Sequence, residues 1–333
     1  MAQKIRMGFI GCGGNASGHV KRVTETLGND VEVVALNDSS QKSLDRLFER
    51  VPAATGIPTF VNYQDMLKEV QMDAVEISTP HTLHFEQIMA SLERGLHVLT
   101  EKPMVCTVNH ARRAIEKAGA VNRVLMISYQ RHFGASFRFI RSLIREGELG
   151  DLQFVSAMQD QNWFRATAGA WRQVLALSGG GQLNDSGSHL LDIVLWMTGL
   201  QVEEVSAFMD YFGGEVDINS ALSLRFTNGA LGTLSIVGNA PHGFWEDITV
   251  WGSKGAVYSR NGKVTCKFEG MSEVYEPEKL PTRFTSPDKN FVDAILGRDE
   301  VQVPPECGLR VIELTEAAWE SARLGGTPVK VKR

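Results

Sequence analysis

The sequence predicts an α/β protein of two domains. We expect the first to contain a doubly wound parallel sheet and the second to be an α+β domain with a large, mainly antiparallel open sheet. Three observations lead to this fold class. A glycine-rich turn follows the first strand pattern, apolar strands then alternate with helical segments, and strand patterns joined by Asn-Gly turns follow from Leu152 onward. We expect the domains to be 1–128 and 129–333.

Length and composition are those of a globular protein. A chain of 333 residues is long for a single core, and 43% hydrophobic with 22% charged residues is not typical of a disordered chain. The net charge is -5 and no run of five like charges occurs. We therefore expect no nucleic acid partner.

The sequence also indicates a compartment. The first residues lack the apolar region of a secretory signal, and no run of about 18 apolar residues could span a membrane. Four cysteines occur far apart without a C-x-x-C pair: Cys12, Cys106, Cys266 and Cys307. We expect a cytoplasmic protein with reduced thiols and no membrane partner.

A dinucleotide-binding turn is predicted after a strand at residues 5–10. Gly11, Gly13 and Ala16 form the pattern G-x-G-x-x-A, which allows a tight turn, close approach of a pyrophosphate and close packing of the next helix. The N-terminus of that helix offers unpaired N–H groups to phosphate. The expected cofactor contacts here are Gly11, Gly13, Gly14, Asn15 and Ala16.

Asp38 follows the second predicted strand, residues 31–36, and lies 22 positions after Ala16. This spacing is close to that of the acid that binds the adenosine ribose hydroxyls, and a carboxylate there repels a 2′-phosphate. We expect NAD as the cofactor, although Ser39 and Ser40 leave NADP open. The alternative role for Asp38 is the N-cap of a helix at residues 41–50.

Further alternation indicates where the chemistry lies. We expect strands at 58–61, 73–78, 96–100 and 124–129, and helices at 41–50, 63–70, 82–94 and 107–119. In a parallel sheet of this kind, ligands bind at the carboxyl ends of the strands. Glu101-Lys102-Pro103 follows one such strand and places a lysine beside a proline at this edge.

The loop with Thr79 and Pro80 follows another of these strands, and we expect it beside the cofactor. His81 and His84 have H-x-x-H spacing, so a metal site is an alternative. No third ligand is evident nearby, and we expect no metal.

The second part of the chain changes to strand patterns. Residues 136–146 predict an amphipathic helix, and Asn228-Gly229 and Asn261-Gly262 predict tight hairpin turns. Adjacent hairpins indicate an antiparallel sheet with one face covered by helices. We expect its other face to be buried against another surface, with a solvated polar face as the alternative. A helix at 309–323 and a strand at 329–331 are interpreted as structural.

The second candidate site is a glycine-rich segment, residues 178–192. Asp185, His189 and Asp192 stand at i, i+4 and i+7, so on a helix they would share one stripe. We interpret this stripe as a functional site. The alternatives are a solvated helix face and a zinc site, which hydride chemistry does not need.

Aromatic and basic residues precede this segment. Sugar rings stack on aromatic faces, and arginine can hold a carboxylate or neighbouring hydroxyls. We expect substrate contacts from this cluster, with packing between domains as the alternative. Its members are Trp163, Phe164, Arg165, Trp171 and Arg172, of which we expect all but Phe164 to contact the substrate.

Several of these motifs, taken in order, resemble the glucose-fructose oxidoreductase and inositol dehydrogenase family (Gfo/Idh/MocA). They are Gly11-x-Gly13-Gly14-x-Ala16, Thr79-Pro80 with His84, Gly95-x-His97-Val98-Leu99 and Glu101-Lys102-Pro103. The segment 179–192 is similar to the family's G-G-x-x-x-D-x-G-x-H-x-x-D pattern. Gln130-Arg131-His132-Phe133 is similar to its crossover into the second domain. The resemblance covers essentially the whole chain.

The resemblance implies roles for these residues. Lys102 would hydrogen-bond the substrate hydroxyl near the nicotinamide, and Lys102-Pro103 would be a cis peptide bond. Asp185 would bind substrate hydroxyls, and His189 would exchange the substrate proton. His84, Glu101 and Lys102 thereby join the expected cofactor contacts, and Gln130 joins the substrate contacts. The family also implies a homodimer or homotetramer through the open sheet.

The predicted function is hydride transfer between NAD(P) and a secondary alcohol of a sugar, inositol or related polyol. His189 would be the general base, because an imidazole with a pKa of about 6.5 suits neutral pH. Two alternatives remain open. One is an NAD-dependent glycosidase of the same family, and the other is a non-catalytic regulator that senses NAD or a sugar.

Overall fold

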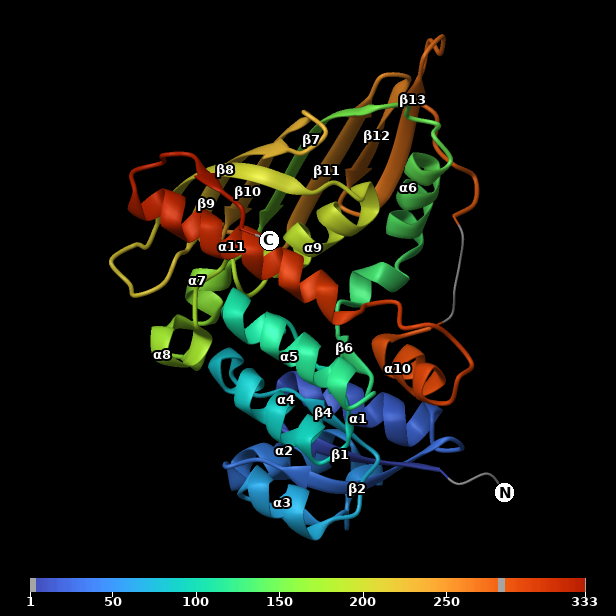
Figure 1. Cartoon of the computed structure of the whole chain (residues 1–333), viewed down its shortest axis with the longest axis vertical. Helices are drawn as coiled ribbons and strands as arrows, with labels where there is room; N and C mark the ends of the chain where they lie inside the picture. The colour runs from blue at the N-terminus through green and yellow to red at the C-terminus, as the bar shows by residue number, and fades with distance from the viewer. Residues whose placement is uncertain (1–3, 281–284, 333) are drawn as a thin grey trace. The chain divides into compact units, whose positions relative to one another are not determined.

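The computed structural model describes residues 4–280 and 285–332, and its contacts divide the chain into two compact units (Figure 1). The first takes in the chain up to Val105, Asn109–Tyr129 and Thr285–Gly308. The second takes in Cys106–Val108, the chain from Gln130 to the gap, and the chain from Leu309 on. The predicted single boundary after residue 128 did not include the return of Thr285–Gly308 to the first unit.

The first unit contains the predicted doubly wound parallel sheet, which is confirmed. Its six strands lie in the order β3-β2-β1-β4-β5-β6, and every pairing is parallel. The strands are β1 Ile5–Ile10, β2 Val31–Asn37, β3 Thr59–Phe60, β4 Ala74–Ile77, β5 His97–Thr100 and β6 Leu125–Ile127. The helices are α1 Gly14–Thr26, α2 Gln41–Arg50, α3 Tyr63–Glu69, α4 His84–Glu93, α5 Val108–Ala120 and α10 Pro287–Ile295, with 3-10 turns η1 Pro52–Ala54 and η2 His81–Leu83.

The strand order places three loops together at one edge. β1 lies between β2 and β4, so the order of strands changes direction beside β1. The N–H of Ser78 donates to the carbonyl of Ile10, and the N–H of Glu101 donates to the carbonyl of Ile77, each at 2.8 Å. The loops after β1, β4 and β5 therefore lie side by side at the switch point, where such sheets bind ligands.

The second unit is built on an eight-stranded sheet in the order β13-β12-β11-β7-β10-β9-β8-β14. Only the β7–β10 pair is parallel among its described pairings, so the prediction of a mainly antiparallel sheet is confirmed. The strands are β7 Leu152–Asp160, β8 Val202–Asp210, β9 Asn219–Phe226, β10 Leu231–Val237, β11 Trp245–Gly252, β12 Gly255–Arg260, β13 Lys263–Phe268 and β14 Val329–Lys330. The helices are α6 Ala135–Arg145, α7 Trp163–Ala166, α8 Leu175–Ser178, α9 Gly187–Thr198 and α11 Pro305–Arg323, with 3-10 turns η3 Gln130–Phe133 and η4 Trp171–Gln173.

The two predicted hairpins form. Asn261 and Gly262 join β12 to β13 with φ angles of 48° and 87°, as a tight hairpin turn requires. Gly229, with φ 89°, lies in the turn between β9 and β10.

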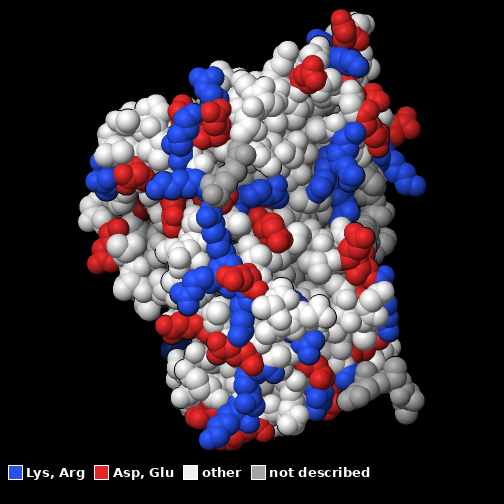
Figure 2. Space-filling model, viewed as in Figure 1, with Lys and Arg blue, Asp and Glu red and all other residues white. Residues whose placement is uncertain are grey.

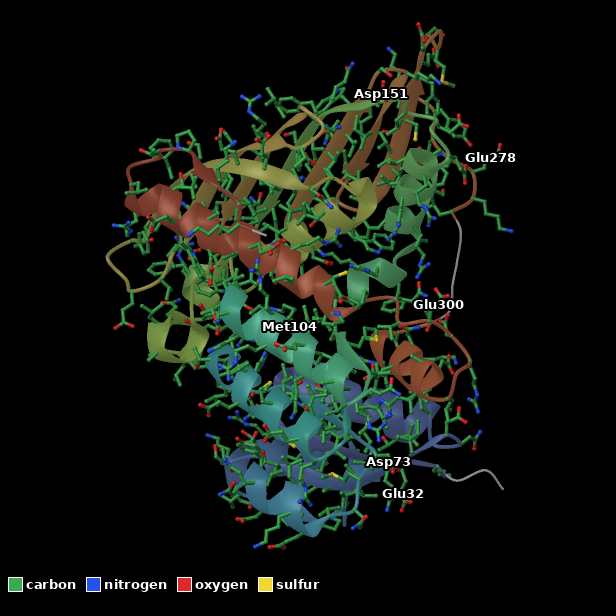
Figure 3. All side chains as sticks on the ribbon, viewed as in Figure 1. Glu32, Asp73, Met104, Asp151, Glu278 and Glu300 are labelled. Atoms are coloured by element: carbon green, nitrogen blue, oxygen red, sulfur yellow. The ribbon has the colours of Figure 1, made fainter. Side chains whose placement is uncertain are left out.

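One face of the second sheet is covered by helices. Figure 1 shows α6, α9 and α11 on the same side of the strands. Along β9, Leu222, Leu224 and Phe226 are buried while the residues between them are exposed, which is the alternation expected of a sheet with one covered face. Buried apolar side chains form the core of each unit, and Figure 3 shows the side chains on the ribbon.

The surface carries both signs of charge. Lys and Arg side chains lie among Asp and Glu side chains on the face that Figure 2 shows. Within residues 4–280 and 285–332, no helix is both long and apolar enough to cross a membrane.

Candidate active site

The predicted dinucleotide turn has the geometry that its motif implies. Gly11 has φ 89°, and a Cβ there would lie 2.8 Å from the backbone of Ser78, so only glycine fits. At Gly13 a Cβ would meet nothing within 4 Å, which leaves open space over the turn. Ala16 is fully buried and lets α1 pack closely, whereas Asn15 is exposed. The start of α1 has no side-chain cap, so its N–H groups face this space.

Asp38 lies at the end of β2 and ties this turn to the neighbouring strand. Its Oδ2 accepts a hydrogen bond from the N–H of Cys12 at 2.8 Å, and its Oδ1 accepts one from the N–H of Ser40. The N-cap residue of α2 is Ser40, and no side chain caps this helix. Asp38 is therefore not its N-cap. Asp38 is half-buried and Ser39 is exposed, and this arrangement fits a dinucleotide with its pyrophosphate over Gly13.

His84, the first residue of α4, holds two of the loops together. Its Nδ1 lies 2.8 Å from the carbonyl oxygen of Pro103, and its Nε2 lies 2.9 Å from the carbonyl oxygen of Thr79. The ring is fully buried. Burial lowers the pKa of His84, and the two carbonyl oxygens oppose that shift. Both ring nitrogens are engaged within the protein, so the structure gives His84 a supporting position behind the loops.

The other loop residues lie at the same edge. Thr79 and Pro80 are half-buried, and the hydroxyl of Thr79 donates to Oε1 of Gln87 in α4. His81 is buried and lies edge-on to His84, with ring centroids 5.9 Å apart.

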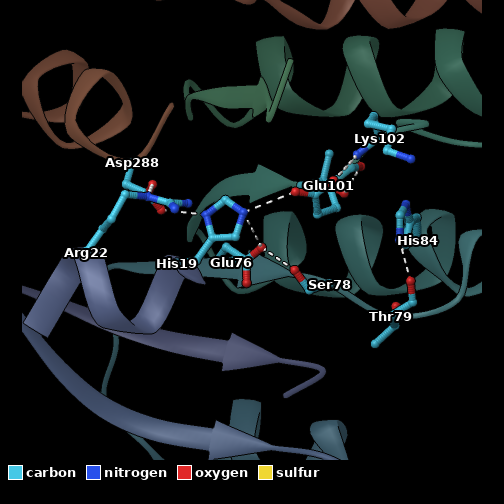
Figure 4. A network of polar contacts seen from close by, with 10 residues as sticks. His19, Arg22, Glu76, Ser78, Thr79, His84, Glu101, Lys102 and Asp288 are labelled. Carbon is cyan, nitrogen blue, oxygen red and sulfur yellow. Dashed lines mark hydrogen bonds and ion pairs between the residues drawn. The ribbon is translucent and has the colours of Figure 1, made fainter. Parts of the chain in front are cut away.

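The Lys102–Pro103 peptide bond is cis, as the resemblance implied. Oε2 of Glu101 accepts the backbone N–H of Lys102 at 3.1 Å, and Lys102 itself is 8% exposed. The loop thus has its N–H held by a carboxylate on one side and the carbonyl of Pro103 held by His84 on the other. Figure 4 shows Lys102 beside Glu101 and His84 bonded to Thr79.

Behind Glu101 lies a buried cluster of charges that sequence analysis did not find (Figure 4). Nε2 of His19 lies 3.1 Å from Oε1 of Glu101, and its Nδ1 lies 2.6 Å from Oδ1 of Asp288. Glu76, in the middle of β4, lies 3.9 Å from the same Nε2 and accepts a hydrogen bond from Ser78. Glu76 in an otherwise apolar strand was the one signal in the sequence; His19 and Asp288 are too far apart in the chain to be paired from it.

The protonation of this cluster follows from its packing. Burial opposes a charge on His19, but the carboxylates of Asp288 and Glu76 outweigh it and hold the pKa of His19 well above its usual value. Burial raises the pKa of Glu76 to about 7, against the opposing effect of His19. Burial also disfavours charged Glu101 and Asp288, yet their partners outweigh it and lower both pKa values.

In the second unit, the glycine-rich segment is held by Asp217. Its Oδ1 accepts the N–H of Gly181 and its Oδ2 accepts the N–H of Leu183, at 3.0 and 2.8 Å. The indole N–H of Trp319 in α11 donates to the same Oδ1. A Cβ at Gly181 would lie 1.9 Å from the carbonyl oxygen of Asp217, so this contact requires glycine.

Asp185 is 3% exposed and lies at the end of that segment. Its Oδ2 accepts hydrogen bonds from Nε1 of Trp163 at 2.7 Å and from Nε of Arg172 at 3.0 Å. Trp163 is itself buried, in a cluster with Val216 and Ile218. Two members of the predicted aromatic and basic cluster therefore orient Asp185.

The prediction of one helical stripe is wrong. Helix α9 begins at Gly187, so Asp185 lies in the turn before it. Asp192 is buried and its Oδ2 lies 2.7 Å from Nε2 of His132, whose ring packs on Trp196. Every residue of α9 except His189 is buried, and His189 is half-exposed.

The remaining predicted substrate residues are more exposed. The guanidinium of Arg172 lies over the ring of Trp171, 4.5 Å from its centroid, and both residues are half-buried. Arg165 in α7 and Gln130 at the start of η3 are exposed.

A doubly wound domain with an open dinucleotide turn, followed by a large-sheet domain that carries Asp185 before α9 and His189 on it, is typical of two-domain nicotinamide-dependent oxidoreductases. Comparison with known proteins gives the family. The chain matches the model of the oxidoreductase family with an NAD-binding Rossmann fold over residues 5–129, and the Gfo/Idh/MocA C-terminal domain over 137–258. The chain belongs to the Gfo/Idh/MocA family of oxidoreductases, and its first domain binds NAD.

Named relatives agree with this assignment. The chain is 31% identical over 267 residues to the rhizopine catabolism protein MocA of Rhizobium meliloti, covering 77% of this chain and 78% of that protein. It is 25% identical to myo-inositol 2-dehydrogenase of Thermotoga maritima, covering 78% and 77%. Its fold is similar to that of the WlbA dehydrogenase of Bordetella pertussis, solved with NADH and UDP-GlcNAcA, with a TM-score of 0.84, 24% identity and coverage of 100% and 99%.

Proposed function

We propose that this protein transfers a hydride between NAD and a secondary alcohol of a sugar, inositol or related polyol. The observation that carries the proposal is the buried support of the cis Lys102–Pro103 loop at the ligand-binding edge of an NAD-binding sheet. The inositol and rhizopine proteins among its relatives support a polyol-like substrate class.

The chain's own groups supply the proton chemistry of the proposal. Bound NAD⁺ supplies the hydride acceptor. His189 takes the proton of the reacting hydroxyl, and its half-exposed position on an otherwise buried helix supports this role. Lys102 holds the reacting oxygen and stabilises the negative charge that develops on it.

Asp185 orients the substrate by accepting a neighbouring hydroxyl. A carboxylate held by Trp163 and Arg172 has little freedom to turn, which favours one substrate pose over others. The remaining proposed substrate contacts are Trp171, Arg172, Arg165 and Gln130.

The cofactor of the proposal is NAD, with NADP as the weaker alternative. Asp38 keeps its carboxylate at the end of β2, beside the dinucleotide turn. A negative charge there binds ribose hydroxyls and repels a 2′-phosphate. Proposed cofactor contacts are Gly11, Gly13, Gly14, Asn15, Ala16, Asp38, Ser39, Thr79, Pro80 and Lys102, with His84 and Glu101 supporting the loops.

A substrate panel tests the proposal. The protein is mixed with NAD⁺ and a series of inositols, aldoses and other polyols while absorbance of the reduced nicotinamide is followed. We expect absorbance to rise with at least one alcohol, more slowly with NADP⁺, and not at all with Lys102→Met. Tight NAD binding without turnover of any alcohol would contradict the proposal and favour a regulator.

A further inference from the structure

The cluster behind Glu101 brings three carboxyl groups around one histidine. Glu76, Asp288 and Glu101 all face His19, and each of these side chains is buried or nearly so. Burying three carboxyl groups near one another is costly unless they are paired. Such a cluster therefore needs a physical reason.

His19 links the three carboxyl groups. Both of its ring nitrogens face carboxylate oxygens, which only accept hydrogen bonds, so both nitrogens carry protons. Arg22, one turn further along α1, donates from Nε to the second oxygen of Asp288. Asp288 of α10 thus fixes one side of the imidazolium, and the other side of the ring bonds Glu101.

The chain of contacts ends at Lys102. Oε1 of Glu101 accepts from His19, which leaves Oε2 to accept the backbone N–H of Lys102. A carboxylate that is bonded through both oxygens cannot rotate without breaking one bond. The orientation of the Lys102 peptide therefore depends on His19, and through His19 on Asp288 (Figure 4).

We propose that His19, held by Asp288, is a positioning residue for Lys102. This inference rests on the proposed function of Lys102. Helix α10 belongs to the segment that returns to the first unit late in the chain, so this segment contributes to the site by fixing His19.

A change at Glu76 can distinguish two roles of His19: positioning Lys102, and balancing the charge of the buried carboxylates. Its Oε1 lies 3.9 Å from Nε2 of His19, beyond hydrogen-bond distance, and accepts from Ser78 instead, so Glu76 has no hydrogen bond in the chain of contacts to Lys102. Loss of the imidazolium removes the effect that opposes the raised pKa of Glu76, so at about pH 8 Glu76→Gln spares the variant the cost of this buried carboxyl group without restoring the contact to Glu101.

The experiment compares His19→Leu, the double variant His19→Leu/Glu76→Gln and the control Lys21→Gln, which removes an exposed cation from the same helix. We expect His19→Leu to lower kcat by about 10- to 100-fold, because misplacement of a catalytic group by about 1 Å costs rates of that order. KM for NAD and NADH affinity should change much less than kcat, because the glycine turn and Asp38 still hold the cofactor. The double variant should regain thermal stability but not kcat, and Lys21→Gln should match the wild type.

Recovery of kcat in the double variant would overturn the proposal, since His19 would then act as a countercharge only. Crystal structures of the wild type and His19→Leu with NADH add a readout independent of turnover. We expect Glu101 and the Lys102 peptide to rotate in the variant, and an unchanged loop would overturn the proposal. If the wild type oxidises no alcohol, the proposed function fails, and the rotation alone decides whether His19 positions Lys102.

Discussion

His189 has the most direct role to test among single residues. It is the half-exposed member of a helix whose other residues are buried. General acid–base groups contribute about 10²- to 10⁴-fold to rates, so His189→Asn should lower kcat by that order while NADH affinity is retained. Steady-state kinetics measure kcat, and a fluorescence titration measures NADH affinity. The control is His242→Asn, an exposed histidine of the same unit, which should leave kcat unchanged.

Glu76 makes a prediction about stability and pH. Its pKa in the folded protein is about 7, above the usual value of 4.5, so the folded state holds this proton more tightly than the unfolded state does. The resulting stabilisation is present below the unfolded pKa and is lost as pH rises through the folded one, by an amount on the order of 3 kcal/mol. The Glu76→Gln variant has no titrating group at this position, so it does not undergo this loss of stability.

Thermal unfolding of wild type and Glu76→Gln at about pH 5 and pH 8 tests this prediction. The difference in Tm, variant minus wild type, should become more positive at the higher pH. The raised pKa of His19 also makes the wild type lose stability above the unfolded histidine pKa, so the variant need not be flat with pH. Parallel Tm profiles for the two proteins would contradict a raised pKa at Glu76.

At the scale of elements, the segment before α9 depends on Asp217. Both of its oxygens accept backbone N–H groups of that segment, at Gly181 and Leu183. Asp217→Asn points an N–H₂ group at one of these donors, and an unsatisfied buried donor costs about 1–3 kcal/mol. We expect a lower Tm and a lower kcat, because Asp185 follows the same turn.

The matched control for this change is Asp210→Asn. Asp210 is exposed, and its Oδ1 accepts the N–H of Phe212, a bond that an asparagine oxygen can keep. Its effect on stability should stay within about 0.5 kcal/mol. Equal Tm values for both variants would show that Asp217 does not stabilise the segment before α9.

Structure that depends on neighbouring residues was predicted well from the sequence, whereas contacts between residues far apart in the chain were not. The glycine turn, the loop after β5 and the hairpins depend on residues adjacent in the chain, and the sequence was sufficient for them. Asp185 was placed on a helix because spacing alone does not reveal a turn that a distant Asp217 holds. The bond between His19 and Asp288 joins residues 269 positions apart, and no periodicity carries that information.

At the scale of the whole molecule, the uncovered face of the second sheet predicts an assembly. Phe154, Trp251 and Tyr258 pack edge to face there and remain half-buried. Apolar rings on an open sheet face favour pairing with another copy of the chain. Light scattering should give a mass two or four times 36.7 kDa, and Trp251→Glu should lower it. Val61→Glu, at a side chain 71% exposed in the first unit, should not change it. A wild type with the monomer mass would contradict this prediction.

Net oxidation of an alcohol by NAD⁺ is tested by the ratio of NADH formed to alcohol consumed. Both are measured in the same reaction, NADH by absorbance and the alcohol by chromatography, with the best substrate of the panel. We predict one NADH for each alcohol oxidised, because the hydride leaves the substrate permanently. Substrate consumed with bond cleavage and no accumulation of NADH would rule out net oxidation and indicate a glycosidase instead.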